Sequence, residues 1–208
     1  MYAVEDSSIT KLITNPKSIV IGDVRYPAKI FSIWSQSKLN AIGIYEVVTD
    51  SSNKKDEQWY INTNESYAFA DNQVTKSWGT ATPKAHADSL YTSQDNTDGL
   101  IPDDKEVGDV KVEGLKTQLI RTLKQQVSNE LARTDWYITR NTEKSTAIPS
   151  AISTHRDAVR TKQAEMETAI TNASNTPALE TLYTYVNTGT EENPVHERPL
   201  GELPTLEI

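Results

Sequence analysis

The sequence predicts an α+β chain with a small N-terminal antiparallel β-rich domain, followed by a C-terminal helical hairpin and an extended tail. Short runs of β-branched and aromatic residues, separated by turn residues, fill the first part of the chain. Apolar residues then recur at helical spacing, and prolines and glycines dominate the last twenty residues. We therefore expect a β-rich domain over residues 1–81, an acidic linker over 82–109, a helical hairpin over 110–186 and a Pro-rich tail over 187–208.

Composition narrows the classes of function. The chain has 208 residues, a formal net charge of -8, 36% hydrophobic residues and no cysteine. The acidity and the lack of a Lys/Arg cluster argue against a nucleic-acid partner. The missing cysteines exclude disulfides and thiolate chemistry. No apolar run approaches the length needed to span a bilayer, so we expect no membrane partner.

The N-terminal segment carries the signals of a small sheet with a helical cover. A β-branched run precedes Gly22-Asp23 within residues 17–26, which predicts a hairpin. Short helical pieces are expected over 28–34 and 35–41, and strand character resumes over 44–48, 59–62 and 66–69. Four aromatic side chains in and after this region can be read either as sheet core or as a sugar-stacking platform, and we favour the core: Trp59, Tyr60, Trp78 and Tyr91.

The acidic segment 82–109 has few apolar residues with which to build a core, which is why we interpret it as a linker. Its run from Asp95 to Gly99 has the oxygen ligands that Ca²⁺ prefers. The EF-hand spacing and its closing glutamate are missing, so a solvated turn is the favoured reading.

Two amphipathic segments form the expected hairpin. In residues 110–132 an apolar stripe advances by three or four, and in residues 149–172 a second stripe begins after Pro149. Between them, residues 131–136 are expected to form the corner, with Thr134 and Asp135 capping through their side chains and the Trp136 ring buried between the two arms. A further helix is expected from Thr176-Pro177.

The tail contains apolar residues with little secondary structure in which to bury them. Leu200, Leu203 and Leu206 stand at every third position among prolines and acids. The tail is therefore either a segment that docks on another subunit or a disordered terminus.

No pattern for chemistry stands out in the sequence. His86, His155 and His196 lie in different segments without ligand-spaced neighbours, and no phosphate-binding glycine loop or nucleophile elbow occurs. We therefore expect a non-enzymatic protein with no catalytic residues, cofactor or metal site, acting by protein–protein contacts.

The corner residues also resemble a known sequence pattern. Leu131-Ala132-Arg133-Thr134-Asp135-Trp136, followed after a gap by His155-Arg156-Asp157-Ala158-Val159-Arg160, resembles the L-L-A-x-T-D-W … Y-R-x-x-L-R pattern of bacteriophage tail assembly chaperone and tail-fibre assembly proteins. The segment from Tyr26-Pro27 through Leu39 and on to Tyr45 is also similar to the N-terminal part of such proteins. The chain departs from the pattern at His155, which replaces an aromatic residue, in the insert 137–148 and in the Pro-rich tail.

The resemblance implies a protein that binds other phage tail or fibre subunits, as a homo- or hetero-oligomer, in the host cytoplasm during assembly. The expected contact residues are Thr134, Asp135, Trp136, Arg156, Arg160, Leu200, Leu203 and Leu206, with the two arginines available to pair with a carboxylate across the hairpin. The departures leave open a structural role in the mature virion tail, such as a connector or fibre-attachment subunit. A carbohydrate-binding module is the third alternative.

Overall fold

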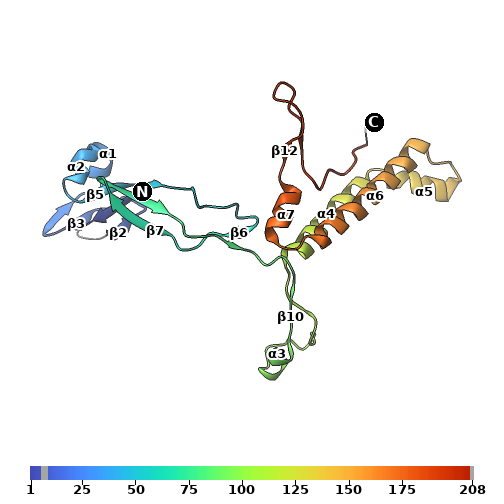
Figure 1. Ribbon diagram of the computed structural model, residues 1–208, viewed down its shortest axis with the longest axis horizontal. Helices are drawn as coiled ribbons and strands as arrows, with labels where there is room; N and C mark the ends of the chain where they lie inside the picture. Colours follow the sequence, from blue (N-terminus) through green and yellow to red (C-terminus); the bar gives the residue numbers. More distant parts are fainter. Residues whose placement is uncertain (6–8, 207–208) are drawn as a thin grey trace. The chain divides into compact units, whose positions relative to one another are not determined.

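The computed structural model describes residues 1–5 and 9–206 of an α+β chain. The chain divides into two compact units, residues 1–82 and residues 83–208, each of which is described by itself (Figure 1). The first unit is built around a sheet, and the second around two long helices.

The sheet of the first unit has the strand order β2-β1-β5-β8-β7. These strands span Tyr2–Glu5 (β1), Ile9–Ile13 (β2), Ile44–Thr49 (β5), Ser66–Ala70 (β7) and Gln73–Ser77 (β8). Neighbouring strands are antiparallel except for β5 and β8, which run parallel with Val47 opposite Val74. The sheet is therefore mixed, whereas the sequence predicts an antiparallel one.

The parallel pair follows from the path of the chain after β5. Residues 50–65 carry the chain away from the sheet and back, and β7 then runs along the sheet edge. A tight turn at Asp71 and Asn72, both with positive φ (51° and 59°), reverses the chain again. The second reversal inserts β8 between β7 and β5, so β8 has the direction of β5.

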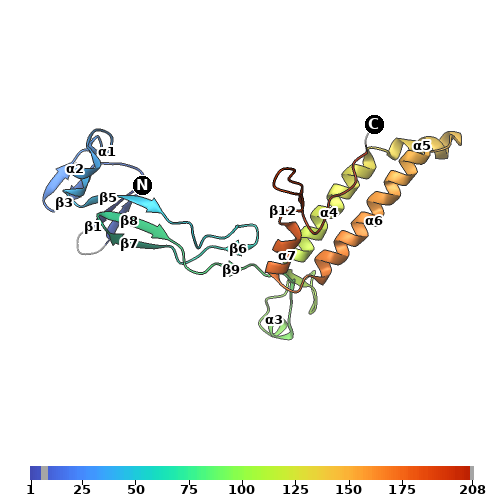
Figure 2. The ribbon, with the colours of Figure 1, turned by 45° about the horizontal axis from the view of Figure 1, so that its top comes forward.

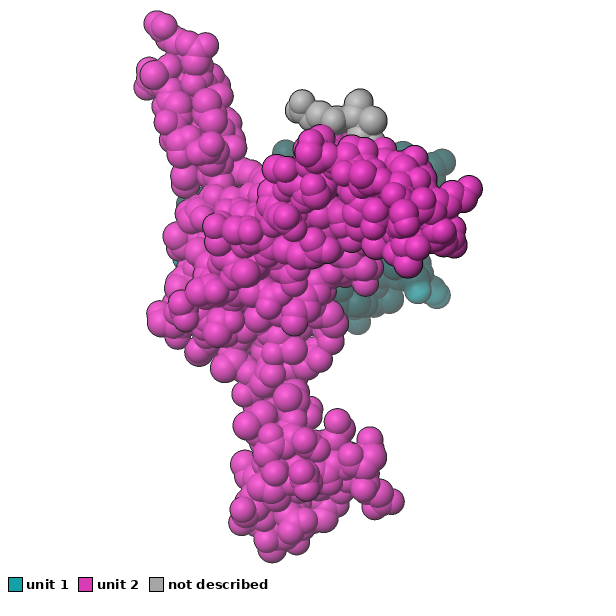
Figure 3. Space-filling model, turned by 90° about the vertical axis from the view of Figure 1, so that its right-hand side faces the viewer, with its two compact units in different colours: residues 1–82 teal, residues 83–208 magenta. Residues whose placement is uncertain are grey.

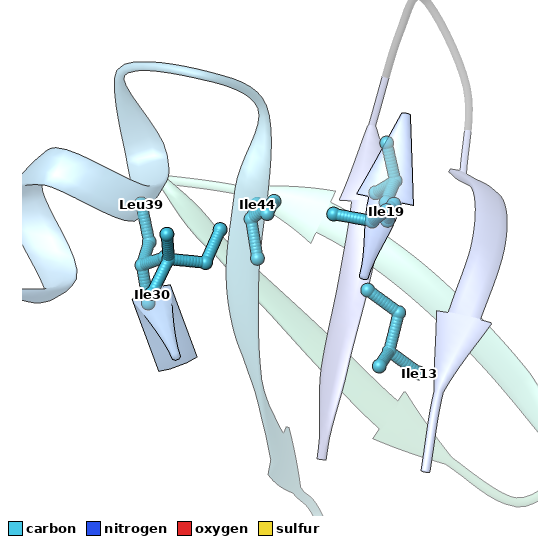
Figure 4. Packing of buried hydrophobic residues seen from close by; sticks show 6 residues of the cluster. Ile13, Ile19, Ile30, Leu39 and Ile44 are labelled. Carbon is cyan, nitrogen blue, oxygen red and sulfur yellow. The ribbon is translucent and has the colours of Figure 1, made fainter. Parts of the chain in front are cut away.

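One face of this sheet is covered by a hairpin and two short helices. The hairpin consists of β3 (Ile19–Ile21) and β4 (Val24–Tyr26), and the helices are α1 (Ile30–Ile33) and α2 (Gln36–Asn40). The hairpin turns at Gly22, whose φ of +57° a glycine adopts without strain, as the sequence predicts. Figure 4 shows the resulting core between strands and helices, made of Val4, Ile13, Ile19, Ile30, Leu39 and Ile44.

Alternation along β1 and β5 places side chains on both faces of the sheet. Val4 and Ile44 point into the covered core, whereas Ala3 and Tyr45 form a smaller cluster with Val74. Strand β1 thus lies next to the sheet centre, although no sequence signal distinguished residues 2–5 as a strand.

Two aromatic residues of the possible sugar platform, Trp59 and Tyr60, are buried. Trp59 and Tyr60 are each 3% exposed, at the start of β6 (Tyr60–Ile61), which pairs with β9 (Thr82–Pro83). Tyr91 belongs to the second unit. This burial agrees with the interpretation of Trp59 and Tyr60 as core residues.

The acidic segment is more structured than the linker that the sequence predicts. Strands β10 (Ser89–Leu90) and β11 (Val110–Val112) pair antiparallel, and α3 (Ser93–Thr97) lies between them in the sequence. A capping box at Thr92 and Asp95 fixes the start of α3. We call residues 85–113 the arm, since it projects from the long helices of its own unit (Figures 1 and 3).

Two long helices dominate the second unit and pack against each other, α4 (Leu115–Ala132) and α6 (Ser150–Asn172) (Figure 2). Between them in the chain lies α5 (Asp135–Lys144), which begins within the expected corner. Helix α4 starts at Leu115 rather than at residue 110, because residues 110–112 pair with β10. The buried rows consist of Leu115, Leu123 and Val127 on α4 and of Ile152, Val159, Met166 and Ile170 on α6.

A third helix, α7 (Thr176–Tyr183), follows α6. Its N-cap is Asn175, whose side-chain oxygen accepts a 2.9 Å hydrogen bond from the Ala178 amide, so the cap lies one residue before the predicted Thr176. Thr176 is buried instead, and its hydroxyl donates to the Lys84 carbonyl oxygen over 2.6 Å. The chain then forms a small hairpin of β12 (Val186–Asn187) and β13 (His196–Glu197) before the last segment.

Candidate functional site

The corner between α4 and α5 is built around a buried threonine. Thr134 is 1% exposed, and its hydroxyl donates to the Leu131 carbonyl oxygen over 3.0 Å. It makes no side-chain cap for α5, which corrects the expected capping role. Asp135 opens α5 in its first turn, where a carboxylate interacts favourably with the helix dipole.

Arg156 on α6 joins the two helices at this corner. Its Nη1 atom donates to the Leu131 carbonyl oxygen (2.8 Å), to Thr134 Oγ1 (2.7 Å) and to Asp135 Oδ1 (2.8 Å). The Arg156 side chain is 9% exposed and that of Asp135 is 61% exposed. The arginine of this ion pair is therefore buried, and the aspartate is open to solvent. Arg156 Nη1 thus contacts three acceptor oxygens, which lie at the end of α4 and the start of α5.

Beside this contact lies a second polar cluster centred on Glu130. His155 Nε2 lies 3.0 Å from Glu130 Oε1, and Arg133 Nη1 donates to both carboxylate oxygens over 3.0 Å. Burial raises the pKa of Glu130, but the Arg133 hydrogen bond, the Leu206 amide, the Arg133 charge and His155 together outweigh it, so its pKa is lowered. The lowered pKa favours the charged carboxylate of Glu130, which connects α4 to α6 through His155.

Trp136 is exposed, which corrects the expectation that its ring is buried between the arms. The residue is 51% exposed, and its ring lies beside that of Tyr137, with the centroids 3.9 Å apart and the planes tilted by 34°. The Arg140 guanidinium lies 4.6 Å from the Trp136 centroid and 5.4 Å from that of Tyr137. The buried side chains at the corner are those of Thr134, His155 and Arg156 instead of Trp136. We call Trp136, Tyr137 and Arg140 the aromatic ledge.

The ledge is carried by a helix with no buried residue. None of the ten residues of α5 is buried, although Trp136 and Ile138 (38% exposed) are large and apolar. Arg140 Nε is also shielded from solvent without an acceptor among the described residues. A short helix gains little stability without packing, so α5 presents side chains that contact little of their own chain.

Arg160, the second arginine of the motif, does not reach the corner. It lies about one turn beyond Arg156, is exposed, and its Nη1 is 3.4 Å from Asp157 Oδ1 on the same helix. The structure thus brings together Thr134, Asp135 and Arg156 and leaves Arg160 outside.

The tail docks on its own chain at Leu200. This residue is 3% exposed, and its amide donates to the Leu182 carbonyl oxygen over 3.0 Å. Leu203 and Leu206 are half-buried, and the Leu206 amide lies 3.4 Å from Glu130 Oε1. Leu200 is therefore unavailable to a partner in this state, and the end of the described tail reaches the polar cluster beside the corner (Figure 2).

Sequence reasoning missed the roles of Glu130, Arg133 and His155. Glu130 stands on α4 one residue before the apolar Leu131, a place where a carboxylate can turn toward the neighbouring helix. The replacement of the motif's aromatic residue by His155 was the available signal, since an imidazole needs a polar partner when it is buried.

Within residues 1–5 and 9–206, no group of three or more His, Cys, Asp or Glu side chains is arranged to hold a metal ion. Among the same residues no helix is both long and apolar enough to cross a membrane. No family model, curated protein or solved structure matches the chain.

Proposed function

We propose that this chain is a non-enzymatic phage tail-associated protein that acts by protein–protein contacts in tail or tail-fibre assembly. The observation that carries the proposal is the contact between the two halves of the tail-assembly motif. Arg156, from the second half, donates to Thr134 and Asp135, from the first half. The two halves are separated in the sequence, and only the resemblance groups them into one motif. These hydrogen bonds bring the two halves into contact.

In this proposal α4 and α6 form a helical hairpin whose corner presents the aromatic ledge to a tail or fibre subunit. Tryptophan, tyrosine and arginine are the residue types that contribute most often to binding hot spots. The two rings and the guanidinium contact one another, and side chains held by such contacts lose less entropy on binding. The exposed Asp135 carboxylate lies next to the ledge and adds a hydrogen-bond acceptor.

The site of action is the host cytoplasm during assembly, and the second candidate role is that of a structural component of the mature virion tail. The two roles differ in whether the protein remains in the finished particle. Carbohydrate binding has less support, because Trp59 and Tyr60 are buried.

The test uses a phage that carries an affinity-tagged copy of this chain. Chemical cross-linking in infected cells, followed by mass spectrometry, should recover a tail or fibre subunit cross-linked near α5. A Tyr185→Ala copy, altered at an aromatic residue of similar exposure (53%), should recover the same subunit, whereas Trp136→Ala should lose it. Recovery of no tail or fibre subunit by the unaltered copy would contradict the proposal.

Mass spectrometry of purified virions then separates the two roles. A protein that acts only in assembly is absent from mature particles. A connector or fibre-attachment subunit is present in a fixed ratio to the other tail proteins.

A further inference from the structure

The arm, residues 85–113, is an ordered projection fixed at its base to α4. Asp88 accepts hydrogen bonds from the Gly114 amide (2.7 Å) and the Thr117 hydroxyl (2.8 Å). Leu115 and Lys116 donate their amides to the carbonyl oxygens of residues 85 and 86. Toward its far end, Lys111 pairs with Asp95, which is also bonded to Thr92. These contacts give the arm a defined direction rather than the freedom of a linker.

The arm has an apolar face that no described residue covers. Leu90 lies opposite Val110 in the β10–β11 pair, so the two side chains share one face of the ribbon, whereas a bulge pairs Val112 with Ser89 on the other face. The side chains of Leu90 and Val110 are 48% and 40% exposed. A two-stranded ribbon is marginally stable alone, and an apolar face of this kind is typical of a protein–protein contact.

The arm also concentrates the negative charge of the chain. Residues 85–113 contain eight acidic and two basic side chains, a formal charge of -6, whereas the whole chain carries -8. Two arms would therefore repel each other, and the surface that accepts an arm must be basic around an apolar centre.

A surface of this chemistry lies on α4 of the same chain. A hollow of about 440 Å³ is lined by Thr117, Ile120, Arg121, Lys124 and Gln125. Ile120 supplies its apolar part, and at its rim stand the side chains of Arg121 (64% exposed) and Lys124 (58% exposed), the latter 3.9 Å from Glu167 on α6. Residues 114–186 hold nine basic and seven acidic side chains, so the helices around the hollow are net positive. Glu113, at the end of the arm, already pairs with Arg121 over 2.7 Å.

The chain exposes more area than two compact units of its mass would. The chain exposes 13646 Å². Two separate compact units of this total mass would expose about 11,600 Å², so the excess is about 2,000 Å², even with no contact between the units. This excess is comparable to the area buried in a specific protein–protein interface.

We propose that the arm of one copy docks into the α4 hollow of a second copy. The face formed by Leu90 and Val110 covers Ile120, and carboxylates of the arm lie beside Arg121 and Lys124. Because arm and hollow are different surfaces, each copy can accept one arm and donate another, which produces a ring or a filament. The partner is thus a second copy of this chain, whichever tail protein binds the corner.

The first experiment uses the absence of native cysteine to trap the contact. One chain carries Val110→Cys in the arm, and a second, size-tagged chain carries Gln125→Cys at the hollow. After mixing and mild oxidation, the disulfide between the two different variants should be more abundant than either disulfide between two copies of the same variant. The control replaces Gln125→Cys with Ser174→Cys, at an exposed position outside the hollow. A mixed disulfide no more abundant than in the control would overturn the proposal.

The second experiment measures association by sedimentation equilibrium of the full chain. Lys124→Glu should raise the dissociation constant at least about tenfold, because a charge at the rim is reversed. Lys38→Glu, which changes the net charge equally at an exposed site of the first unit, should leave it unchanged. Circular dichroism confirms that both variants are folded. An unaltered chain that stays monomeric at all concentrations, or equal effects of the two variants, would overturn the proposal.

Discussion

Arg156 on α6 and Asp135 at the start of α5 are joined by a 2.8 Å ion pair, through the same nitrogen that contacts Thr134 and the Leu131 carbonyl oxygen. The guanidinium is buried and the carboxylate is exposed. The corner therefore depends more on the arginine than on its charge partner.

This asymmetry predicts unequal effects of the two substitutions. Arg156→Met should lower the free energy of unfolding of the helical unit by about 2 to 3 kcal/mol, since it leaves the buried Thr134 hydroxyl oxygen without a donor and removes the hydrogen bonds between α6 and the corner. Asp135→Asn should cost less than about 1 kcal/mol, because solvent screens an exposed charge. Urea unfolding, followed by the circular dichroism of the helices, measures both. Equal effects would contradict the geometry of the corner.

Trp136→Ala should change the free energy of unfolding by less than about 1 kcal/mol, since an exposed stack contributes little. A tryptophan buried between α4 and α6 would instead cost on the order of 3 kcal/mol or more. The melting temperatures of the two proteins distinguish these cases. A large decrease would show that the ring packs inside the corner.

Leu200 anchors the tail, so its truncation should be costly. Leu200→Ala should lower the free energy of unfolding by about 2 to 4 kcal/mol, because the side chain is buried beside α7. Val195→Ala, at a residue 48% exposed, serves as the control and should change it by less than about 0.5 kcal/mol. Equal stability of the two variants would mean that the tail does not dock in solution.

The arm should lose order in acid. The Lys111 hydrogen bond, followed by those from Thr92, lowers the pKa of Asp95 from 3.8 to about 2. Since the folded pKa is the lower one, the stabilisation is present above pH 3.8 and is lost as the pH falls toward 2. The Thr92 amide, which donates to Asp95 over 2.8 Å, reports this change in NMR spectra. In Asp95→Asn the arm should lack this transition, and its persistence there would contradict the assignment.

Local signals predicted local structure well. The β-branched run before Gly22-Asp23 predicted the β3–β4 hairpin, and the helical piece predicted over 28–34 is α1. Both depend on residues close in the sequence. The place of β1 beside β5 and the parallel pairing of β5 with β8 depend on contacts across forty and about twenty-five residues, which no local pattern encodes.

The sequence likewise predicted some features of the candidate site and missed others. The sequence pointed to a carboxylate partner for the motif arginines, and Arg156 has one because α6 returns past the corner at that residue. Arg160 and Trp136 lie elsewhere than expected, since periodicity predicts which face of a helix is apolar but not which side chain fills the space at its end. The ordered arm was missed because its few apolar residues and many acids are also typical of a linker.

Complementation of a phage that lacks this chain tests the central claim, that the corner binds a tail or fibre subunit through its aromatic ledge, most directly. The count of complete, infectious particles should be restored by the unaltered chain and by Tyr185→Ala. We predict that Trp136→Ala fails to restore it while its melting temperature stays unchanged. Full restoration by a folded Trp136→Ala chain would contradict the account.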